Sequence, residues 1–286
     1  MSFLSPRIGI IMLLIVEDIT KEIKQRYDVD LNSYANKLLI STINKRMFKL
    51  DFTMQQTYLD FFHTDPDEAV VLLQQIGVNV SSFFRNPMVY SILEQRILPE
   101  LIERKRKQGL NEIRIWSAGC ASGEEPYSIA ILIHQLLKKS FKQWRIHIFA
   151  TDIDRESLNQ AVQGTFSRDR LQDTRLGIYD AYFTRVDAGY SLAPEVRQMV
   201  NFSFEDLLSS GKVAPAASIF GSFDLILCRN VLIYFNKSAQ KVAIQKFIKT
   251  LTSKSYLILG ESECIDKNLK SAFMEIDIIN RIYKTK

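Results

Sequence analysis

The pattern of apolar and polar positions changes about a third of the way along the chain. Between residues 19 and 76, apolar side chains recur at helical spacing and no strand-like alternation lasts, which predicts a small helical domain. From about residue 111 onward, short runs rich in β-branched and aromatic residues alternate with helical segments. Such alternation is typical of an α/β fold with a mostly parallel sheet, which binds its ligand at the carboxyl ends of the strands.

The second part of the chain divides into predicted strands and helices. Strands are expected over residues 113–117, 145–151, 200–204, 223–228 and 256–260, with a late hairpin across 273–283. Helices are expected over residues 126–139, 155–163 and 238–251. Residues 164–199 are too many for one connection and predict an inserted subdomain.

One helix of the first part has clear end signals. Asp65 suits an N-cap, Pro66 suits the first helical position, and Glu68 completes a capping-box pattern. Gly77 then supplies a C-terminal stop, so a helix is predicted over residues 66–76.

A second helix, over about residues 33–50, has a basic face. No acidic residue occurs from residue 31 to residue 50, while Lys45 and Lys49 lie one turn apart with Arg46 beside them. Such a face is either a solvated surface or a docking surface for an acidic partner, and the pattern alone favours neither.

The composition is that of an ordinary folded protein. Of the 286 residues, 47% are hydrophobic and 24% are charged, with 11 glycines and 7 prolines, which excludes disordered, collagenous and low-complexity classes. The net charge of +5 suits an acidic partner but does not indicate a nucleic-acid-binding tail. The longest apolar run, over residues 8–16, is too short to span a membrane and is interpreted as an N-terminal helix or as an over-long start before Met12.

The cysteines and histidines have no metal-site or disulfide pattern. The three cysteines are far apart and include no C-x-x-C pair, and the three histidines have no H-x-x-x-H spacing. No metal site is expected, and the cytoplasm is the natural compartment for such a chain.

The first predicted strand ends in a glycine-bearing turn that leads directly into a helix. A dinucleotide site would have G-x-G-x-x-G there, whereas Gly119 and Gly123 are separated by three residues and are followed by Glu124 and Glu125. Two carboxylates would repel a pyrophosphate but attract the ammonium and sulfonium of S-adenosylmethionine. Acids in a first helical turn are also explained by the helix dipole, so this loop alone leaves both interpretations open.

Acidic residues also follow the next two predicted strands. Asp154 is expected to cap the following helix, which leaves Asp152 at the strand tip to accept the ribose hydroxyls of a nucleoside, as in both NAD and S-adenosylmethionine sites. Asp206 is interpreted either as an acceptor for an adenine amino group, with a neighbouring leucine packed on the ring, or as a turn residue.

Polar residues interrupt an apolar stretch after the fourth predicted strand. Asn236 is available to cap the next helix, so Arg229, Asn230 and Tyr234 are predicted to serve the site at the carboxyl edge of the sheet. No Pro-Pro pair follows the asparagine, which disfavours a nucleobase as methyl acceptor.

Five motifs together resemble the chemotaxis-receptor glutamate methyltransferases, the CheR family. They are residues 79–85 (NVSSFFR), 116–128 (WSAGCASGEEPYS), 150–154 (ATDID), 228–235 (CRNVLIYF) and 260–263 (GESE). The resemblance covers nearly the whole chain. It implies a helical N-terminal domain (residues 1–88), a linker helix (89–110) and a Rossmann-like S-adenosylmethionine-dependent methyltransferase domain (111–286) with a small β-subdomain inserted at about 164–199.

The resemblance also assigns residues to the cofactor, whose product is S-adenosylhomocysteine. The positions that match the family's cofactor contacts are Asn79, Ser81, Arg85, Glu125, Asp152, Asp206, Leu207, Arg229 and Asn230. Ser81 stands where the family more often has threonine, and Asp206 stands where asparagine is common. The contact on the adenine side therefore departs most from the family pattern.

The reaction that the resemblance implies is methyl esterification of receptor glutamates. A glutamate with a pKa of about 4.3 is already ionised at neutral pH, so the site has to align the reactants rather than supply a base. Arg85 and Tyr234 are predicted to position them. The alternative is an adaptor that binds S-adenosylmethionine without turnover, while an NAD oxidoreductase is opposed by the two glutamates of the first loop.

The resemblance further implies a partner, the cytoplasmic helical bundle of a chemoreceptor. The basic helix with Lys45, Arg46 and Lys49 is its expected docking face. Residues 182–190 lack the longer glycine-rich loop of family members that capture a receptor's C-terminal peptide. We therefore expect a cytoplasmic, tether-independent enzyme that acts as a monomer and does not insert into the membrane.

Overall fold

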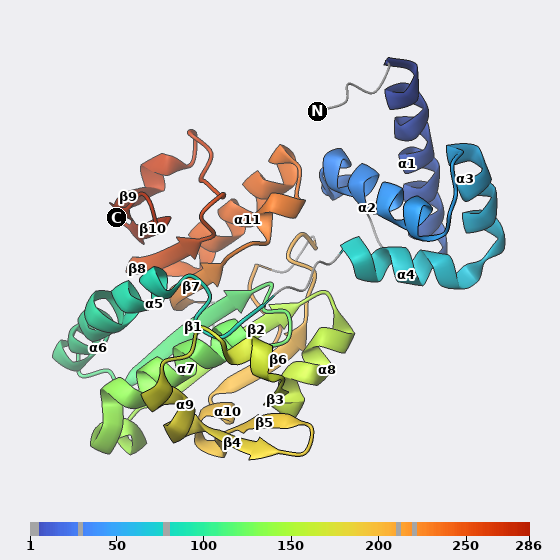
Figure 1. Ribbon diagram of the computed structural model, residues 1–286. Coiled ribbons are helices and arrows are strands. Elements are labelled where there is room, and N and C mark those ends of the chain that lie inside the picture. The colour runs from blue at the N-terminus through green and yellow to red at the C-terminus, as the bar shows by residue number, and fades with distance from the viewer. Residues whose placement is uncertain (1–5, 28–30, 77–80, 210–212, 219–221) are drawn as a thin grey trace. The chain divides into compact units, whose positions relative to one another are not determined.

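Helices form the first part of the chain and a seven-stranded sheet forms the centre of the rest (Figure 1). The computed structural model describes residues 6–27, 31–76, 81–209, 213–218 and 222–286. A helical unit comprises Met1–Val78 together with Ile233–Gln240, and a sheet unit comprises Asn79–Leu232 and Lys241–Lys286. The helical unit thus includes a short segment that follows the fourth strand of the sheet.

The helical unit buries one apolar cluster between its helices. Its elements are α1 (Pro6–Tyr27), η1 (Leu31–Ser33), α2 (Asn36–Lys49), α3 (Gln55–Thr64) and α4 (Pro66–Ile76). Ile19, Ile43, Phe62 and Leu72 contribute to this cluster from the four α-helices. Because each helix presents an apolar stripe at helical spacing, the stripes meet in a common core.

Helix α4 begins where its capping residue predicts. Oδ1 of Asp65 accepts the backbone N–H of Asp67 at 2.9 Å and that of Glu68 at 3.3 Å. Gly77, the predicted stop, lies outside the described residues. The capping-box prediction for Glu68 is wrong, because its carboxylate turns into the core and accepts hydrogen bonds there.

A buried ion pair crosses the core of the helical unit. Nε of Arg46 donates to Oε1 of Glu68 at 2.8 Å, a second guanidinium nitrogen donates to Oε2, and the hydroxyl of Tyr58 donates to Oε1 at 2.8 Å. The hydrogen bond to Glu68 raises the pKa of Arg46, and burial raises the pKa of Tyr58. Arg46 is 6% exposed, so the prediction that it belongs to the basic surface of its helix is wrong.

The sheet unit is built on strands in the order β6-β2-β1-β7-β8-β10-β9. The strands are β1 (Glu112–Ala118), β2 (Arg145–Asp152), β6 (Val200–Phe204), β7 (Phe223–Cys228), β8 (Leu251–Leu259), β9 (Phe273–Asp277) and β10 (Ile282–Thr285). The first five in space are parallel, and β10 runs antiparallel to β8 and β9. The five predicted strands and the late hairpin are confirmed, although β8 begins earlier than expected.

Helices cover both faces of the sheet (Figure 1). They are α5 (Pro87–Ile92), the π-helical turn η2 (Leu93–Ile97), α6 (Leu98–Lys107), α7 (Glu124–Leu137), the 3-10 helix η3 (Lys138–Gln143), α8 (Arg155–Gln163) and α11 (Lys237–Thr250). Ile115 packs in the cluster that contains α6 and α7, while its neighbour Trp116 lies 5.3 Å, centre to centre, from the ring of Phe247 on α11. The two side chains separate in this way because successive residues of a strand point to opposite faces.

The predicted insertion is confirmed as a small subdomain. It consists of β3 (Thr165–Phe166), η4 (Arg168–Leu171), α9 (Leu176–Tyr182), β4 (Phe183–Val186), β5 (Gly189–Leu192) and α10 (Pro194–Arg197), with an antiparallel sheet in the order β3-β5-β4. The ring of Phe83 lies edge-on to Phe166 and to Phe183, at 4.8 and 5.0 Å between centres. The insertion therefore anchors the motif that precedes α5.

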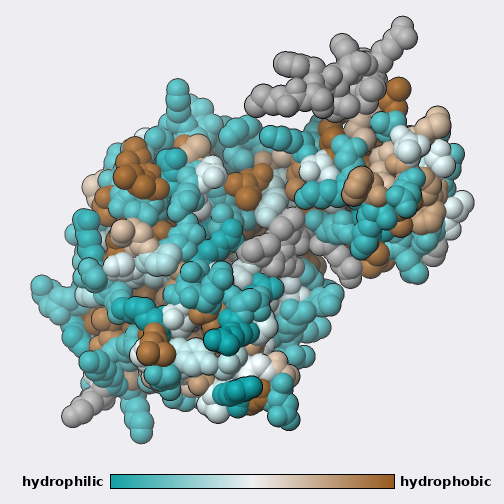
Figure 2. Space-filling model, viewed as in Figure 1, coloured by the Kyte–Doolittle hydropathy of each residue, from teal (hydrophilic) through white to brown (hydrophobic). Residues whose placement is uncertain are grey.

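The remaining described elements are two short 3-10 helices, η5 (Leu232–Tyr234) and η6 (Lys270–Ala272). Across the described ranges, none of the helices combines the length and apolar character that crossing a bilayer requires. Figure 2 shows a largely hydrophilic surface on the visible face of the sheet unit, with hydrophobic residues in isolated spots.

The buried ion pair gives a stability prediction. Glu68→Gln leaves the charge of Arg46 buried without its carboxylate, which is expected to lower the free energy of unfolding of the helical unit by about 3 kcal/mol. Urea unfolding of the full chain measures this change. The control is Glu17→Gln on the exposed side of α1, which is expected to stay within about 0.5 kcal/mol of wild type. Equal stability of the two variants would contradict the prediction.

Candidate active site

The predicted site residues of the sheet unit gather at the carboxyl edge of its parallel strands. Glu125 follows β1, Asp152 ends β2, Asp206 follows β6 and Arg229 follows β7. Backbone hydrogen bonds join neighbouring strand ends: Gly119 N–H donates to the carbonyl of Thr151 at 2.8 Å, and Glu205 N–H donates to that of Asp152 at 3.0 Å. This edge, beside β1, where the order of the strands in the sheet reverses, is where open α/β sheets bind ligands.

The loop after β1 is tight and depends on glycine. Gly119 and Gly123 have φ angles of +78° and +94°, a region that residues with a side chain rarely adopt. A Cβ atom on Gly119 would lie 2.3 Å from Cγ2 of Val231. The backbone of the loop therefore packs directly on the segment that follows β7.

Glu124 serves the structure of this loop. Its side chain is completely buried, both carboxylate oxygens accept from the Ser122 hydroxyl at 2.9–3.0 Å, and Arg170 of the insertion pairs with it at 3.2 Å. The hypothesis that both glutamates face a cationic ligand is therefore wrong for Glu124. Helix α7 also begins at Glu124, two residues earlier than predicted.

Glu125 and Arg229 form the charged centre of the site. The Ser117 hydroxyl donates to Oε1 of Glu125 at 2.8 Å, and Arg229 pairs with Oε2 at 3.4 Å. Burial raises the pKa of Glu125, an effect that the arginine and the serine hydroxyl oppose. The guanidinium also lies 5.5 Å from the centre of the Tyr90 ring. Its Nε atom is buried and has no hydrogen-bond partner among the described residues.

Arg85 occupies a turn that is held from several sides. Phe84 and Asn86 on either side of it have φ angles of +55° and +62°. Phe84 N–H donates to Oγ of Ser128 at 3.0 Å, and a guanidinium nitrogen of Arg229 donates to the carbonyl of Arg85 at 3.0 Å. The turn is thereby fixed between α7 and the end of β7.

The start of this linker motif is described in part. The carbonyl of Ser81 accepts a hydrogen bond of 2.5 Å from Arg170, and Phe83 N–H donates to the carbonyl of the same arginine at 2.9 Å. Asn79, a predicted cofactor contact, lies outside the described residues.

Asp152 sits at the tip of β2, as predicted. Its Oδ2 accepts Ala121 N–H at 2.7 Å and its Oδ1 accepts Asp154 N–H at 2.9 Å. Burial raises its pKa, and the backbone hydrogen bonds lower it. Because each carboxylate oxygen has two lone pairs, the group retains capacity to accept further hydrogen bonds. Asp154 caps α8 by accepting Glu156 N–H at 2.9 Å, which confirms its predicted role.

The segment after β6 contains the two residues predicted on the adenine side. Oδ1 of Asp206 accepts Leu208 N–H at 2.8 Å, so this aspartate has the turn role that was one of its two interpretations. Asp206 and Leu207 are both half-buried. The second carboxylate oxygen of Asp206 takes no part in this turn hydrogen bond.

The segment after β7 divides between the two units. Arg229 and Asn230 belong to the sheet unit, and Tyr234 belongs to the helical unit. The carbonyl of Tyr234 accepts Ala35 N–H at 2.8 Å, and its side chain is half-buried. Asn236 caps α11 by accepting Ala239 N–H at 2.9 Å, as predicted.

Several residues that build the site were not predicted. Ser117 and Ser128 lie inside the motifs that carry the family resemblance, so their position is the signal that could have singled them out. Arg170 lies in the insertion and has no local pattern. It reaches Ser81, which is 89 positions away, only through the fold.

Comparison with known proteins shows which family the chain belongs to. Residues 79–280 match the family model described as "CheR methyltransferase, SAM binding domain". A chemotaxis protein methyltransferase of Borreliella burgdorferi is 31% identical over 255 residues, which cover 87% of this chain and 88% of that protein. One of Listeria innocua is 33% identical over 252 residues, covering 86% of this chain and 88% of that protein. The family model and these relatives each match most of the chain. The protein therefore belongs to the CheR methyltransferase family, a family of enzymes whose methyl donor is S-adenosylmethionine.

Proposed function

We propose that the enzyme esterifies glutamate side chains of chemoreceptors, producing glutamate methyl ester and S-adenosylhomocysteine. The observation that carries this proposal is the pair that buried Arg229 forms with Glu125 beside the turn that presents Arg85, in a chain whose relatives are named chemotaxis protein methyltransferases. The alternative of an adaptor without turnover is not favoured, because those relatives are named as enzymes.

The described residues fit the methyl donor at both of its ends. Glu125 is a half-buried carboxylate with a raised pKa that a cationic ammonium group would stabilise, and Nε of Arg229 beside it is buried with no hydrogen-bond partner among the described residues. Asp152 would accept the ribose hydroxyls, while Asp206 and Leu207 would meet the adenine. Asn79, Ser81, Arg85 and Asn230 complete the set that the family resemblance assigns to the cofactor.

The reaction needs alignment more than proton transfer. S-Adenosylmethionine, when bound, supplies an electrophilic methyl group on a sulfonium, and the electron pair of the broken carbon–sulfur bond stays on sulfur. The attacking glutamate is ionised at neutral pH, so no proton has to leave it. Arg85 would orient this carboxylate or the carboxylate of the donor, and Tyr234 would contribute a hydroxyl or line the methyl path. Excluding water strengthens the attraction between the charged partners.

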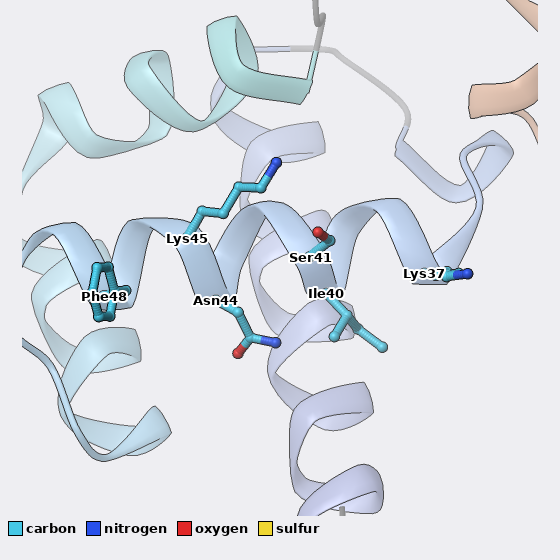
Figure 3. A pocket seen from close by; sticks show the side chains of 6 residues that line it. All are labelled: Lys37, Ile40, Ser41, Asn44, Lys45 and Phe48. Carbon is cyan, nitrogen blue, oxygen red and sulfur yellow. The ribbon is translucent and has the colours of Figure 1, made fainter. Parts of the chain in front are cut away.

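The docking face that we propose for the receptor is the exposed side of α2. Figure 3 shows the side chains along a shallow groove there, which is lined by Lys37, Ile40, Ser41, Asn44, Lys45 and Phe48. Lys45 and Lys49 are exposed one turn apart, and Phe48 is 86% exposed. A helix that carries glutamates among apolar residues would match this combination of positive charge and an exposed ring.

We propose that the enzyme docks on the receptor bundle without also binding the C-terminal peptide of the receptor. The turn between β4 and β5 contains only Asp187 and Ala188, so the inserted subdomain has no long loop there that would enclose a C-terminal peptide. The enzyme would act in the cytoplasm, where the helical bundle of a chemoreceptor lies, and as a monomer.

The proposed reaction is tested by following a tritiated methyl group from S-adenosylmethionine to membranes that carry the chemoreceptors of the host. Label on the receptor band that mild base releases as methanol is the expected result, and labelling stable to base would contradict carboxyl methylation.

Arg85→Ala is expected to lower kcat/KM about 100-fold through lost alignment. Tyr234→Phe is expected to lower it about tenfold. Arg145→Ala, at the opposite edge of the sheet, is the control and should leave the rate unchanged.

A pH dependence follows from the raised pKa of Glu125. The ionised carboxylate attracts the ammonium group, so protons compete with the ligand as the pH falls toward this raised pKa. The Kd of S-adenosylhomocysteine is expected to rise as the pH is lowered through this raised pKa, by at most about tenfold per pH unit for one group. Calorimetric titration of wild type and Glu125→Gln measures the two slopes. A slope that persists in Glu125→Gln would assign the titration to another group.

The docking face predicts a charge effect on receptor binding alone. Lys45→Glu combined with Lys49→Glu is expected to raise KM for receptor membranes at least about tenfold, with kcat unchanged, because like charges then face an acidic partner. Added salt should shrink the difference from wild type. Lys21→Glu, an exposed lysine on α1, is the matched control. Equal KM values for the double variant and this control would rule out the α2 face.

A further inference from the structure

The motif at residues 260–263 has no role in the site as described so far. It follows β8 at the same carboxyl edge as the other site segments. The side chain of Glu263 is 3% exposed. A buried carboxylate requires hydrogen-bond partners, because burial without them is strongly unfavourable.

Three backbone N–H groups supply those partners. Oε2 of Glu263 accepts Gly260 N–H at 2.5 Å and Asn230 N–H at 3.2 Å, and Oε1 accepts Val231 N–H at 2.8 Å. Two of the three donors lie more than 30 positions earlier in the chain, in the segment that follows β7. One carboxylate therefore joins the ends of β7 and β8 with charge-assisted hydrogen bonds.

The segment that Glu263 holds has a conformation that needs support. Asn230 has a φ of +61°, in the left-handed region that is unfavourable for residues with a Cβ atom. The residue on one side of it, Arg229, carries the contacts to Glu125 and to the carbonyl of Arg85. The residue on the other side, Val231, packs against Gly119 in the first loop. A shift of this turn would therefore move the contacts of Arg229 and the packing of Val231 against Gly119 at the same time.

Gly260 shows how closely these groups fit. A Cβ atom there would lie 2.8 Å from the backbone nitrogen of Asn230 and 2.8 Å from Oε2 of Glu263. The absence of a side chain at this position is therefore what allows the carboxylate to reach the turn.

We propose that Glu263 is a positioning residue for the methyl donor: its carboxylate holds the Arg229–Asn230–Val231 turn in the conformation that completes the S-adenosylmethionine site. This inference rests on the proposed function. It differs from a purely structural role, in which loss of the carboxylate would lower stability while leaving the donor site of the folded protein intact.

The test compares binding of S-adenosylhomocysteine by the full chain and its variants, at a temperature where circular dichroism shows each of them folded. Glu263→Gln turns one acceptor oxygen into a donor facing backbone N–H groups, so the Kd is expected to rise at least about tenfold. Glu263→Asp keeps the charge on a shorter side chain and should recover part of the affinity. Gly260→Ala disturbs the same contacts without changing charge and should weaken binding in the same direction. Glu275→Gln, at an exposed ion pair with Lys270, is the matched control.

Hydrogen exchange of the amides at residues 229–231 supplies the readout that separates positioning from stability. Faster exchange of these amides in Glu263→Gln, together with weaker binding, is expected. Wild-type affinity in the folded Glu263→Gln and Gly260→Ala variants would overturn the proposal, as would weaker binding with unchanged exchange. If Glu263→Gln does not fold, the Gly260→Ala and Glu263→Asp variants decide the question. Absence of binding by the wild-type protein would instead count against the proposed function.

Discussion

The buried guanidinium of Arg229 links the segments that make up the site. It pairs with Glu125 at the start of α7, donates to the carbonyl of Arg85 and lies against the ring of Tyr90 on α5. An arginine held at 7% exposure is stable only where acceptors surround it. The first loop, the linker turn and the end of β7 are therefore set in position by the same charge, and none of them can move alone without exposing or unpairing it.

Backbone conformation adds a second constraint at the same place. Phe84, Asn86 and Asn230 all have positive φ angles, and each lies in a segment that contacts Arg229 or contains its neighbour. Residues with a side chain keep such conformations where surrounding contacts hold them. Here Ser128, Glu261 and Glu263 supply those contacts as side-chain partners. Strain of this kind gathers at a binding edge, and the supporting residues come from α7 and from the segment after β8.

The helical unit uses its charges differently. Arg46 is buried in the core, where it pairs with Glu68, whereas Lys45 and Lys49 lie on the surface of the same helix. Adjacent residues of a helix point in directions about 100° apart, so a basic run in the sequence need not be a basic face. The surface available to an acidic partner is consequently narrower than the run of charges indicated, and the exposed ring of Phe48 is part of it.

Elements whose signals lie within a few residues of one another could be predicted from the sequence. Alternating strands and helices, the caps Asp154 and Asn236, and an acid at the tip of β2 all depend on residues a few positions apart, and the structure has them where they were expected. Tertiary structure alone decided which of two adjacent glutamates stays at the ligand edge and which is buried. Glu124 forms an ion pair with Arg170, and Glu125 forms one with Arg229, which is 104 positions away in the sequence. Such partners meet only after the strands assemble, so burial and pairing, which set the chemistry of a charged group, are properties of the fold rather than of the local pattern.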